Sequence, residues 1–206
     1  MIFYSPTEWS FTRQHREEVK MVLSGIDCVL DSQQVIYCSS EITSGANLYA
    51  AMRRHHVKCD GELKQIIGEA GFKADIMEPN MKAANQFAEA VRCAFPQRTI
   101  VITPAPFVAP GWIQREYLAL WEELLRTRIK SCWFNRNWEF SNGCTFEFAV
   151  ALDAGLPTFD QDGQALDRQA GIHAVEAAVL RLESEGFHCV KLRENLDRMR
   201  AAGLGA

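Results

Sequence analysis

Short runs of β-branched and aromatic residues alternate with longer segments whose apolar residues recur at helical spacing, along almost the whole sequence. The strand-like runs lie at 35–40, 98–106, 131–135, 156–160 and, as a last and weaker candidate, 188–192. The helical segments lie at 12–24, 44–56, 62–70, 81–95, 113–128, 141–155 and 171–187. Parallel strands need crossover connections of helix length, which these segments provide. The pattern therefore predicts an α/β fold with a mostly parallel sheet and helices on both of its faces.

The chain of 206 residues is long enough for one domain with a sizeable core and short for two domains. We predict a single α/β domain over residues 35–206, preceded by a helical N-terminal extension over residues 1–34. The amphipathic helix of the extension ends before Gly25. Three roles for the extension stay open: it could cover the site, exchange between subunits or pack against the domain.

The composition does not favour a nucleic-acid polymer or a membrane as partner. The net charge is −4, whereas a surface that coats nucleic acid is basic. The first 20 residues are charged and lack the apolar stretch of a signal peptide. No run approaches the roughly 20 apolar residues of a membrane span. We therefore expect a small-molecule ligand.

The cysteines indicate a reducing compartment rather than a disulfide framework. All seven occur singly, without a Cys-x-x-Cys pair or a histidine at metal-ligand spacing. We expect reduced thiols, a cytoplasmic location and no metal site. The sequence also lacks the Gly-x-Gly-x-x-Gly and P-loop patterns, so ordinary dinucleotide and nucleoside triphosphate sites are not expected.

Polar segments follow the predicted strands at the edge where a parallel sheet binds its ligands. The crevice beyond the carboxyl ends of the strands is the usual ligand site in such sheets. The segments that would meet there are 38–45, 103–112 and 135–143.

The start of the helix at 141–155 is the strongest candidate for chemistry. Ser141 or Asn142 can cap the helix, and Gly143 lets the backbone approach a ligand, so free N–H groups and the positive end of the helix dipole face the crevice. A sugar hydroxyl or an anion fits that position. Glu147 lies about one turn further along the same helix.

Glu147 is flanked by phenylalanine on both sides. The helix dipole favours its ionised form by roughly 0.3–1 kcal/mol, while burial opposes ionisation. An ionised carboxylate in an apolar wall is a competent nucleophile or stabiliser of an oxocarbenium ion. The alternative is that Glu147 points to solvent or pairs with a nearby arginine such as Arg136.

The stretch 138–157, WEFSNGCTFEFAVALDAGLP, resembles the signature of the nucleoside 2-deoxyribosyltransferase and deoxynucleotide N-glycosidase superfamily. In its hydrolase branch, Ser-x-Gly-x-x-aromatic-Glu precedes a helix that ends in Gly and leads to a short apolar strand. The residues in that register are Ser141, Gly143, Phe146 and Glu147. Short phage and bacterial relatives that carry Trp-Glu-x-Ser-x-Gly before the same Glu are similar through Trp138 and Glu139 as well.

The stretch VIYCSSEITSGANLY is similar to the first strand and loop of this superfamily, where an aromatic and small polar residues hold the base and the sugar phosphate. The residues in compatible places are Tyr37, Ser39, Ser40 and Gly45. The monophosphate hydrolases carry arginines in this loop, whereas residues 42–44 are Ile, Thr and Ser here. Ordinary turn chemistry at the end of a strand is the alternative role of the serines.

The superfamily also places an acid on the helix before the catalytic strand, and Glu116 has the comparable setting here. Its spacing to Glu147 is longer than in the small hydrolases, and it could equally be a solvated helix residue. Trp112, Trp133 and Trp138 could provide a stacking wall for a base, although tryptophans at strand ends are more often part of a core or an interface.

The resemblance implies a flavodoxin-like or Rossmann-like domain that hydrolyses the N-glycosidic bond of a nucleoside or nucleotide, or exchanges its base. Glu147 would attack the anomeric carbon, Glu116 would orient a hydroxyl or assist proton transfer to the leaving base, and Tyr37 would flank the base. The first turn, with Ser141, Asn142, Gly143 and Trp138, would contact the sugar or its 5′ substituent.

The resemblance further implies no metal or redox cofactor, and a homodimer or higher homo-oligomer with the helix at 113–128 as a candidate interface. Two rival functions stay open. One is a non-catalytic nucleotide-binding or sensor protein of the same fold. The other is an interaction protein whose tryptophan-rich region is a docking face.

Overall fold

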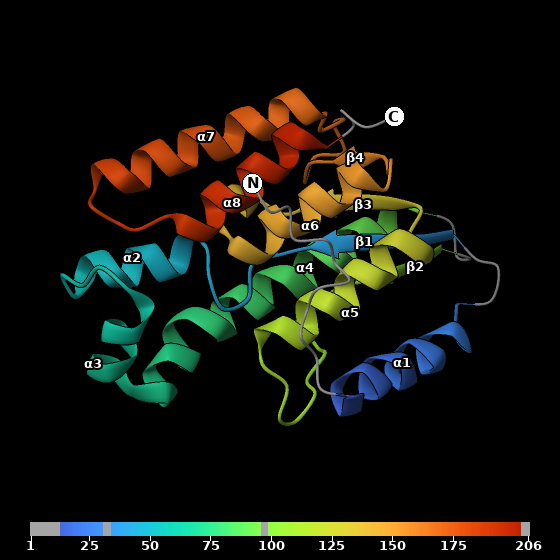
Figure 1. Cartoon of the computed structure of the whole chain (residues 1–206), viewed down its shortest axis with the longest axis horizontal. Helices are drawn as coiled ribbons and strands as arrows, with labels where there is room; N and C mark the ends of the chain where they lie inside the picture. The colour runs from blue at the N-terminus through green and yellow to red at the C-terminus, as the bar shows by residue number, and fades with distance from the viewer. Residues whose placement is uncertain (1–12, 31–33, 96–98, 203–206) are drawn as a thin grey trace.

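The computed structural model describes residues 13–30, 34–95 and 99–202 (Figure 1). Its strands are β1 (Gln34–Ser39), β2 (Thr99–Ile102), β3 (Ser131–Phe134) and β4 (Thr158–Phe159). Its α-helices are α1 (Arg13–Asp27), α2 (Ala46–Arg54), α3 (Asp60–Phe72), α4 (Glu78–Ala94), α5 (Gln114–Thr127), α6 (Asn142–Asp153), α7 (Arg168–Ser184) and α8 (Val190–Ala201). A π-helical turn, η2 (Lys73–Met77), precedes α4, and a 3₁₀ turn, η3 (Trp138–Phe140), precedes α6.

The strands of the described residues form one all-parallel sheet in the order β2-β1-β3-β4. The predicted parallel sheet is therefore confirmed. From β1 the chain crosses to β2 on one side and then to β3 on the other side, so the order of strands reverses between β1 and β3. Such a switch point opens a crevice outside the carboxyl ends of the two strands.

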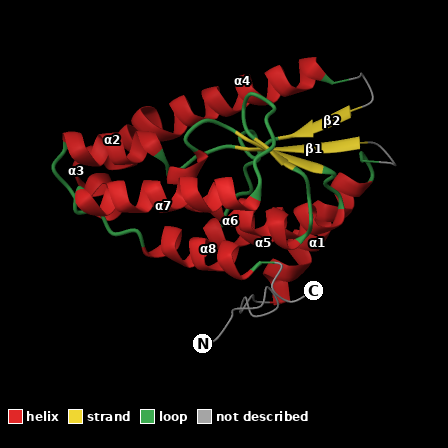
Figure 2. Ribbon diagram, turned by 90° about the horizontal axis from the view of Figure 1, so that it is seen from above, coloured by secondary structure: helices red, strands yellow, loops and turns green. Residues whose placement is uncertain are grey.

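Helices cover both faces of the sheet, as predicted (Figure 2). Because side chains of a strand alternate between faces, Ile36 and Cys38 pack toward α4, where they meet Phe87 and Val91. Tyr37 and the other alternate residues face the larger core, which α5 and α6 cover. The sequence of α6 is apolar almost all round, and this helix is buried along most of its length.

The helix of the N-terminal extension packs against α5. Val19, Val22, Leu23 and Ile26 of α1 lie against the main core, and Arg128 donates to Asp27 at 2.5 Å. Of the three roles left open by the sequence, packing is the one the described part of the extension fulfils. Part of the surface of the predicted interface helix α5 is consequently in contact with α1 within the same chain.

The strand predicted at 188–192 is wrong, because the chain enters α8 at Val190. The apolar residues Leu192, Leu196 and Met199 recur at helical spacing and are buried against α6 and α7. The sequence prediction stopped at the short β-like run and missed this continuation. Within the described ranges, no helix is long and apolar enough to cross a membrane.

Candidate functional site

Glu147 is buried at the carboxyl end of β1, with 4% of its surface exposed. The Tyr37 hydroxyl donates to Oε1 of Glu147 at 2.8 Å, and the Ser39 hydroxyl donates to Oε2 at 2.6 Å. This arrangement excludes the alternative in which Glu147 points to solvent. Arg136 is exposed and forms no ion pair with Glu147 among the described contacts.

The register of β1 explains why two of its residues reach the same carboxylate. Tyr37 and Ser39 are two positions apart, so they project from the same face of the strand toward α6. β1 pairs with β3 at this point, since Ser39 lies opposite Phe134. Glu147 therefore stands beside the switch point between β1 and β3, where open parallel sheets bind their ligands.

Burial and hydrogen bonding act on Glu147 in opposite directions. Loss of water raises the pKa of Glu147 to about 7, while the hydrogen bonds from Ser39 and Tyr37 oppose that rise. Burial and the nearby Glu147 raise the pKa of Tyr37 well above its usual value, so Tyr37 keeps its proton and remains a donor. The site thus holds a carboxylate that changes charge near neutral pH.

Ser141 starts α6 in the predicted way. Its backbone is extended, and its hydroxyl accepts from the Cys144 N–H at 3.3 Å. The same hydroxyl lies 3.1 Å from the Ser44 hydroxyl, which comes from the loop after β1. Thr145 donates to the Ser141 carbonyl at 2.9 Å. The cap of α6 is therefore joined directly to the loop that follows β1.

The loop at 40–45 is held over the site from a second direction. Asn80 of α4, which is buried, donates to the carbonyls of Ile42 and Ser44 at 3.0 and 3.2 Å. The Glu41 carboxylate accepts from the Ala46 N–H at 2.9 Å, at the start of α2. The loop that follows Ser39 is therefore tied to both α4 and α6.

Of the ten predicted site residues, the structure joins Tyr37, Ser39 and Glu147 directly by hydrogen bonds. Ser141 starts the helix that bears Glu147, and its hydroxyl contacts Ser44 and the Cys144 N–H. The Ser40 hydroxyl is buried without a hydrogen-bond partner among the described residues.

Asn142 and Gly143 lie partly exposed on the first turn of α6. A Cβ at Gly143 would lie 3.8 Å from the Ser141 hydroxyl, so packing within the chain does not demand glycine there.

Gly45 is required by the fold. Its φ is +92°, and a Cβ at this position would lie 1.7 Å from Oε2 of Glu41. The predicted role of Gly45 as a ligand contact is thus joined by a structural role, since only glycine allows the Glu41 carboxylate to approach the start of α2.

The three tryptophans do not form one stacking wall. Trp138 is buried against Phe134 and Phe148, with ring centroids 5.1 and 4.7 Å apart. Trp112 packs with Phe107, whereas Trp133 stacks on Phe159. The core alternative therefore describes these residues better than contact with a base.

Glu116 caps its own helix. It is buried, and its Oε2 accepts from the Ile113 N–H at 2.9 Å in a capping-box geometry. Its other oxygen lies 3.6 Å from Nε of Arg115. The alternative of a solvated residue is wrong, but the hydrogen bond that positions Glu116 holds it to the start of α5 rather than to Glu147.

Sequence reasoning did not single out several residues that build the site, namely Glu41, Ser44, Asn80 and Asn195. Asn195 of α8 donates to the Asn142 carbonyl at 3.0 Å and to the Thr145 hydroxyl at 2.9 Å. Asn80 and Asn195 are polar residues inside amphipathic helices, and only the tertiary contacts distinguish them from solvated positions. The polar run after β1 did contain a usable signal, because it includes Glu41 and Ser44.

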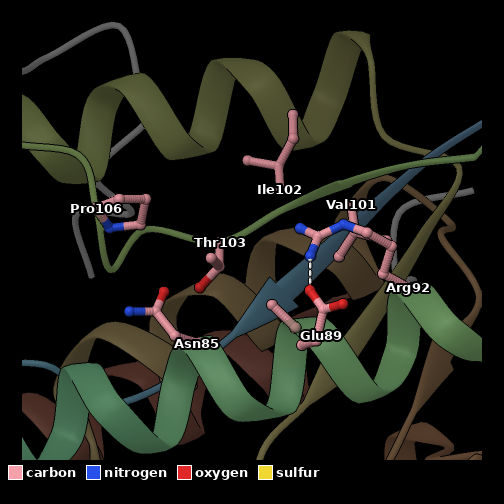
Figure 3. A pocket seen from close by; sticks show the side chains of 8 residues that line it. Asn85, Glu89, Arg92, Val101, Ile102, Thr103 and Pro106 are labelled. Atoms are coloured by element: carbon pink, nitrogen blue, oxygen red, sulfur yellow. Dashed lines mark hydrogen bonds and ion pairs between the residues drawn. The ribbon is translucent and has the colours of Figure 1, made fainter.

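A cavity of about 410 Å³ lies elsewhere, between α4 and β2 (Figure 3). Its lining includes Asn85 and Thr103, whose hydroxyl oxygen is buried without a partner among the described residues, and the Glu89–Arg92 ion pair. This cavity is on the α4 face of the sheet, whereas Glu147 is on the α6 face.

Within the described residues, no group of at least three His, Cys, Asp or Glu side chains could hold a metal ion. Comparison of the chain with protein-family models, with curated proteins and with solved structures finds no match. A function must therefore be argued from the geometry around Glu147.

Proposed function

We propose that this protein breaks the N-glycosidic bond of a nucleoside or nucleotide, and passes the sugar to water or to a second base, with Glu147 as the nucleophile. The observation that carries the proposal is the buried Glu147 carboxylate, held through both of its oxygens by Tyr37 and Ser39 beside the switch point of the sheet. The resemblance of residues 138–157 to N-glycosidases and deoxyribosyltransferases supports the same chemistry.

The hydrogen bonds suit a nucleophile better than a proton donor. An ionised carboxylate accepts at both oxygens, and both oxygens of Glu147 already face hydroxyl donors. If Glu147 were protonated, one of its oxygens would carry a proton that faces the hydroxyl of Tyr37 or Ser39. That hydroxyl would then have to rotate, or its hydrogen bond to Glu147 would be lost. In the ionised form, Glu147 can attack the anomeric carbon and form a glycosyl ester that water or a second base then cleaves.

Tyr37 takes a different role from the one expected at the level of sequence. Its side chain is fully buried, its ring lies 5.8 Å from that of Trp121, and its hydroxyl is committed to Glu147. We assign Tyr37 and Ser39 to positioning of the nucleophile instead of contact with the base. For substrate to reach Glu147, the loop at 40–45 opens and then closes again, so the Ser44–Ser141 contact is broken and re-formed.

The first turn of α6 is proposed to hold the sugar. Asn142 and Gly143 are partly exposed there, and the N–H groups of a first helical turn can donate to a hydroxyl. Their position one turn before Glu147 would set the anomeric carbon against the carboxylate.

The test is release of free base from a panel of ribonucleosides, 2′-deoxyribonucleosides and their 5′-monophosphates, with and without a second base as acceptor. We expect release by the wild type and a loss of about 1,000-fold or more in Glu147→Gln, because the nucleophile is gone. Glu122→Gln is the matched control, since Glu122 is equally buried but pairs with Arg126 and Arg198 on α5 and α8.

A non-catalytic binding or sensor protein gives a different result. The panel would then raise the melting temperature of the wild type, while neither the wild type nor Glu147→Gln released base. Two observations favour this second function: Glu147 is buried, and hydrogen bonds hold the loop at 40–45 to α4 and α6.

A further inference from the structure

A second carboxylate, Glu41, lies on the loop that closes the site. The residue two positions before it, Ser39, donates to Glu147, and the residue three positions after it, Ser44, contacts Ser141. One end of this short segment is therefore attached to Glu147, and the other is attached to Ser141, the N-cap of the helix that bears Glu147. Burial raises the pKa of the Cys144 thiol on α6, and the charges of Glu147 and Glu41 both add to that rise.

The pKa values of Glu147 and Glu41 are both raised to about 7, and the two carboxylates differ instead in their hydrogen bonds. Glu147 accepts from a donor at each oxygen. Glu41 accepts at Oε2 from the Ala46 N–H, and its Oε1 has no hydrogen-bond donor among the described residues. Oε1 of Glu41 is thus the oxygen that can carry a proton and donate it.

The surroundings of Glu41 favour the protonated form. Burial raises the pKa of Glu41 to about 7, the Ala46 N–H opposes that rise, and the nearby Glu139 adds to it. The titratable groups that interact with Glu41 are Glu139 on η3 and Cys144 on α6. None of these groups is a cation that would hold Glu41 in its ionised form.

Close packing against Gly45 and hydrogen bonds from Asn80 hold Glu41 in position. Gly45 is buried with a φ of +92°, and any side chain there would overlap the Glu41 carboxylate. Asn80 holds the carbonyls on both sides of residue 43, which fixes the loop that bears Glu41. A glutamate that merely capped α2 would not need this enclosure, because a short serine or aspartate caps from solvent.

We infer that Glu41 is the acid that protonates the leaving base in the reaction proposed for Glu147, and this inference rests on that proposed function. As Glu147 forms its ester bond to the anomeric carbon, the C–N bond breaks and its electron pair goes to the base nitrogen. The proton from Oε1 of Glu41 goes to the departing base. In the second step water attacks the anomeric carbon and gives its proton to the Glu41 carboxylate, while the bond from that carbon to Glu147 breaks and releases the Glu147 carboxylate.

This assignment takes the role that the sequence resemblance gave to Glu116. Glu116 spends one oxygen on the cap of α5, far along the chain from the loop, whereas Glu41 lies on the segment attached to Glu147 and Ser141 at its two ends. A pair of carboxylates, one as nucleophile and one as acid, is the usual arrangement in glycoside cleavage by retaining enzymes.

The experiment compares Glu41→Gln with wild type on two substrates that share a sugar. One is the nucleoside that releases most base, and the other is the 4-nitrophenyl glycoside, whose leaving group departs without a proton. Glutamine keeps an oxygen that can accept from the Ala46 N–H. We expect kcat on the nucleoside to fall about 100-fold or more, and kcat on the nitrophenyl glycoside to change by less than about threefold.

The pH profile gives a second readout. An acid must be protonated to act, so wild-type kcat on the nucleoside should decline as pH rises through the pKa of Glu41, near 7. In Glu41→Gln that alkaline decline should disappear. Glu139→Gln is the matched control, because Glu139 is the neighbouring carboxylate, and it should keep the alkaline limb with a small shift to lower pH.

The outcomes separate this inference from the proposed function. Equal losses on both substrates in Glu41→Gln would overturn the acid role and leave Glu41 as a structural residue, while the reaction of Glu147 stood. Retention of nucleoside cleavage in Glu41→Gln would overturn it as well. Absence of release by the wild type from every nucleoside and nitrophenyl glycoside would instead reject the proposed function itself.

Discussion

At the scale of single residues, the behaviour of Glu147 depends on two hydroxyl groups. The carboxylate has lost nearly all of its water, and Tyr37 and Ser39 replace that water with one donor for each oxygen. A buried carboxylate without such donors would take up a proton well above neutral pH. The hydroxyls thus decide how much of Glu147 is ionised at the pH where the reaction would run.

Tyr37→Phe tests this dependence directly. The pKa of Glu147 is raised to about 7 in the folded state, so its contribution to stability is complete below its ordinary value of 4.5 and is lost as pH rises through about 7. Removing the Tyr37 donor raises that pKa further and makes the loss larger. We expect Tyr37→Phe to cost about 1 kcal/mol at acidic pH and about 2–3 kcal/mol at pH 8.5.

The measurement is urea unfolding at both pH values. Tyr49→Phe is the control, because Tyr49 is a buried tyrosine whose hydroxyl has no hydrogen bond in the described structure. Its cost should be small and independent of pH. A pH-independent cost for Tyr37→Phe would show that its hydroxyl does not stabilise the ionised carboxylate.

Sequence reasoning reached Glu147, Tyr37 and Ser39 but not the contact between them. The cap residues and the apolar helix single out Glu147 locally, and the strand pattern singles out the end of β1. The hydrogen bond from Tyr37 to Glu147 joins residues 110 positions apart, and that pairing depends on how α6 lies on the sheet. Consequently the sequence predicts that Tyr37 contacts the base, whereas in the structure its hydroxyl donates to the Glu147 carboxylate.

At the scale of elements, the first turn of α6 is a junction of three segments. The loop after β1 reaches it through Ser44, and α8 reaches it through Asn195, which bonds to Asn142 and Thr145. α8 was not predicted, because a short β-like run hid the start of its helical spacing. The missing element left the support of the site incomplete even though the catalytic candidate was found.

The two glycines predicted to contact the ligand should respond oppositely to alanine. Gly45→Ala places a Cβ on the Glu41 carboxylate at a φ of +92°, so we expect a loss of about 1–3 kcal/mol. Gly143→Ala meets only ordinary contact at 3.8 Å inside a helix, so we expect no loss or a gain of up to about 1 kcal/mol.

Chemical unfolding of the two variants and the wild type measures both effects. If Gly143 serves approach of a sugar to the first turn of α6, Gly143→Ala should raise KM for the best substrate while its stability is unimpaired. Equal destabilisation by the two substitutions would contradict the distinction between a glycine that the fold requires and one that leaves room for a ligand.

At the scale of the whole molecule, alternation of strands and helices was enough to predict a parallel sheet covered on both faces. It was not enough to predict the strand order, because the pattern along the chain does not say on which side of β1 each later strand pairs. The order β2-β1-β3-β4 puts β1 beside β3, so the switch point of the sheet lies next to Glu147. The fold class was enough to predict that the candidate site lies at the ends of the strands. The residues that surround Glu147 depend on tertiary contacts, so the sequence could not predict them.

The N-terminal extension should behave as part of this single structure. Leu23 of α1 is partly buried against the core beneath it, whereas Met21 on the same helix is 71% exposed. We expect Leu23→Asp to lower the unfolding free energy by about 2 kcal/mol or more, because it puts a charge into the apolar contact between α1 and α5. Met21→Asp should change it by less than about 0.5 kcal/mol.

Sedimentation measurements on the same variants test whether α1 shields apolar surface of α5. If Leu23→Asp undocks α1, that surface becomes available to a second chain, so self-association should be higher in Leu23→Asp than in Met21→Asp. Equal stability and equal association of the two variants would mean that α1 is an appendage whose packing contributes nothing to the domain.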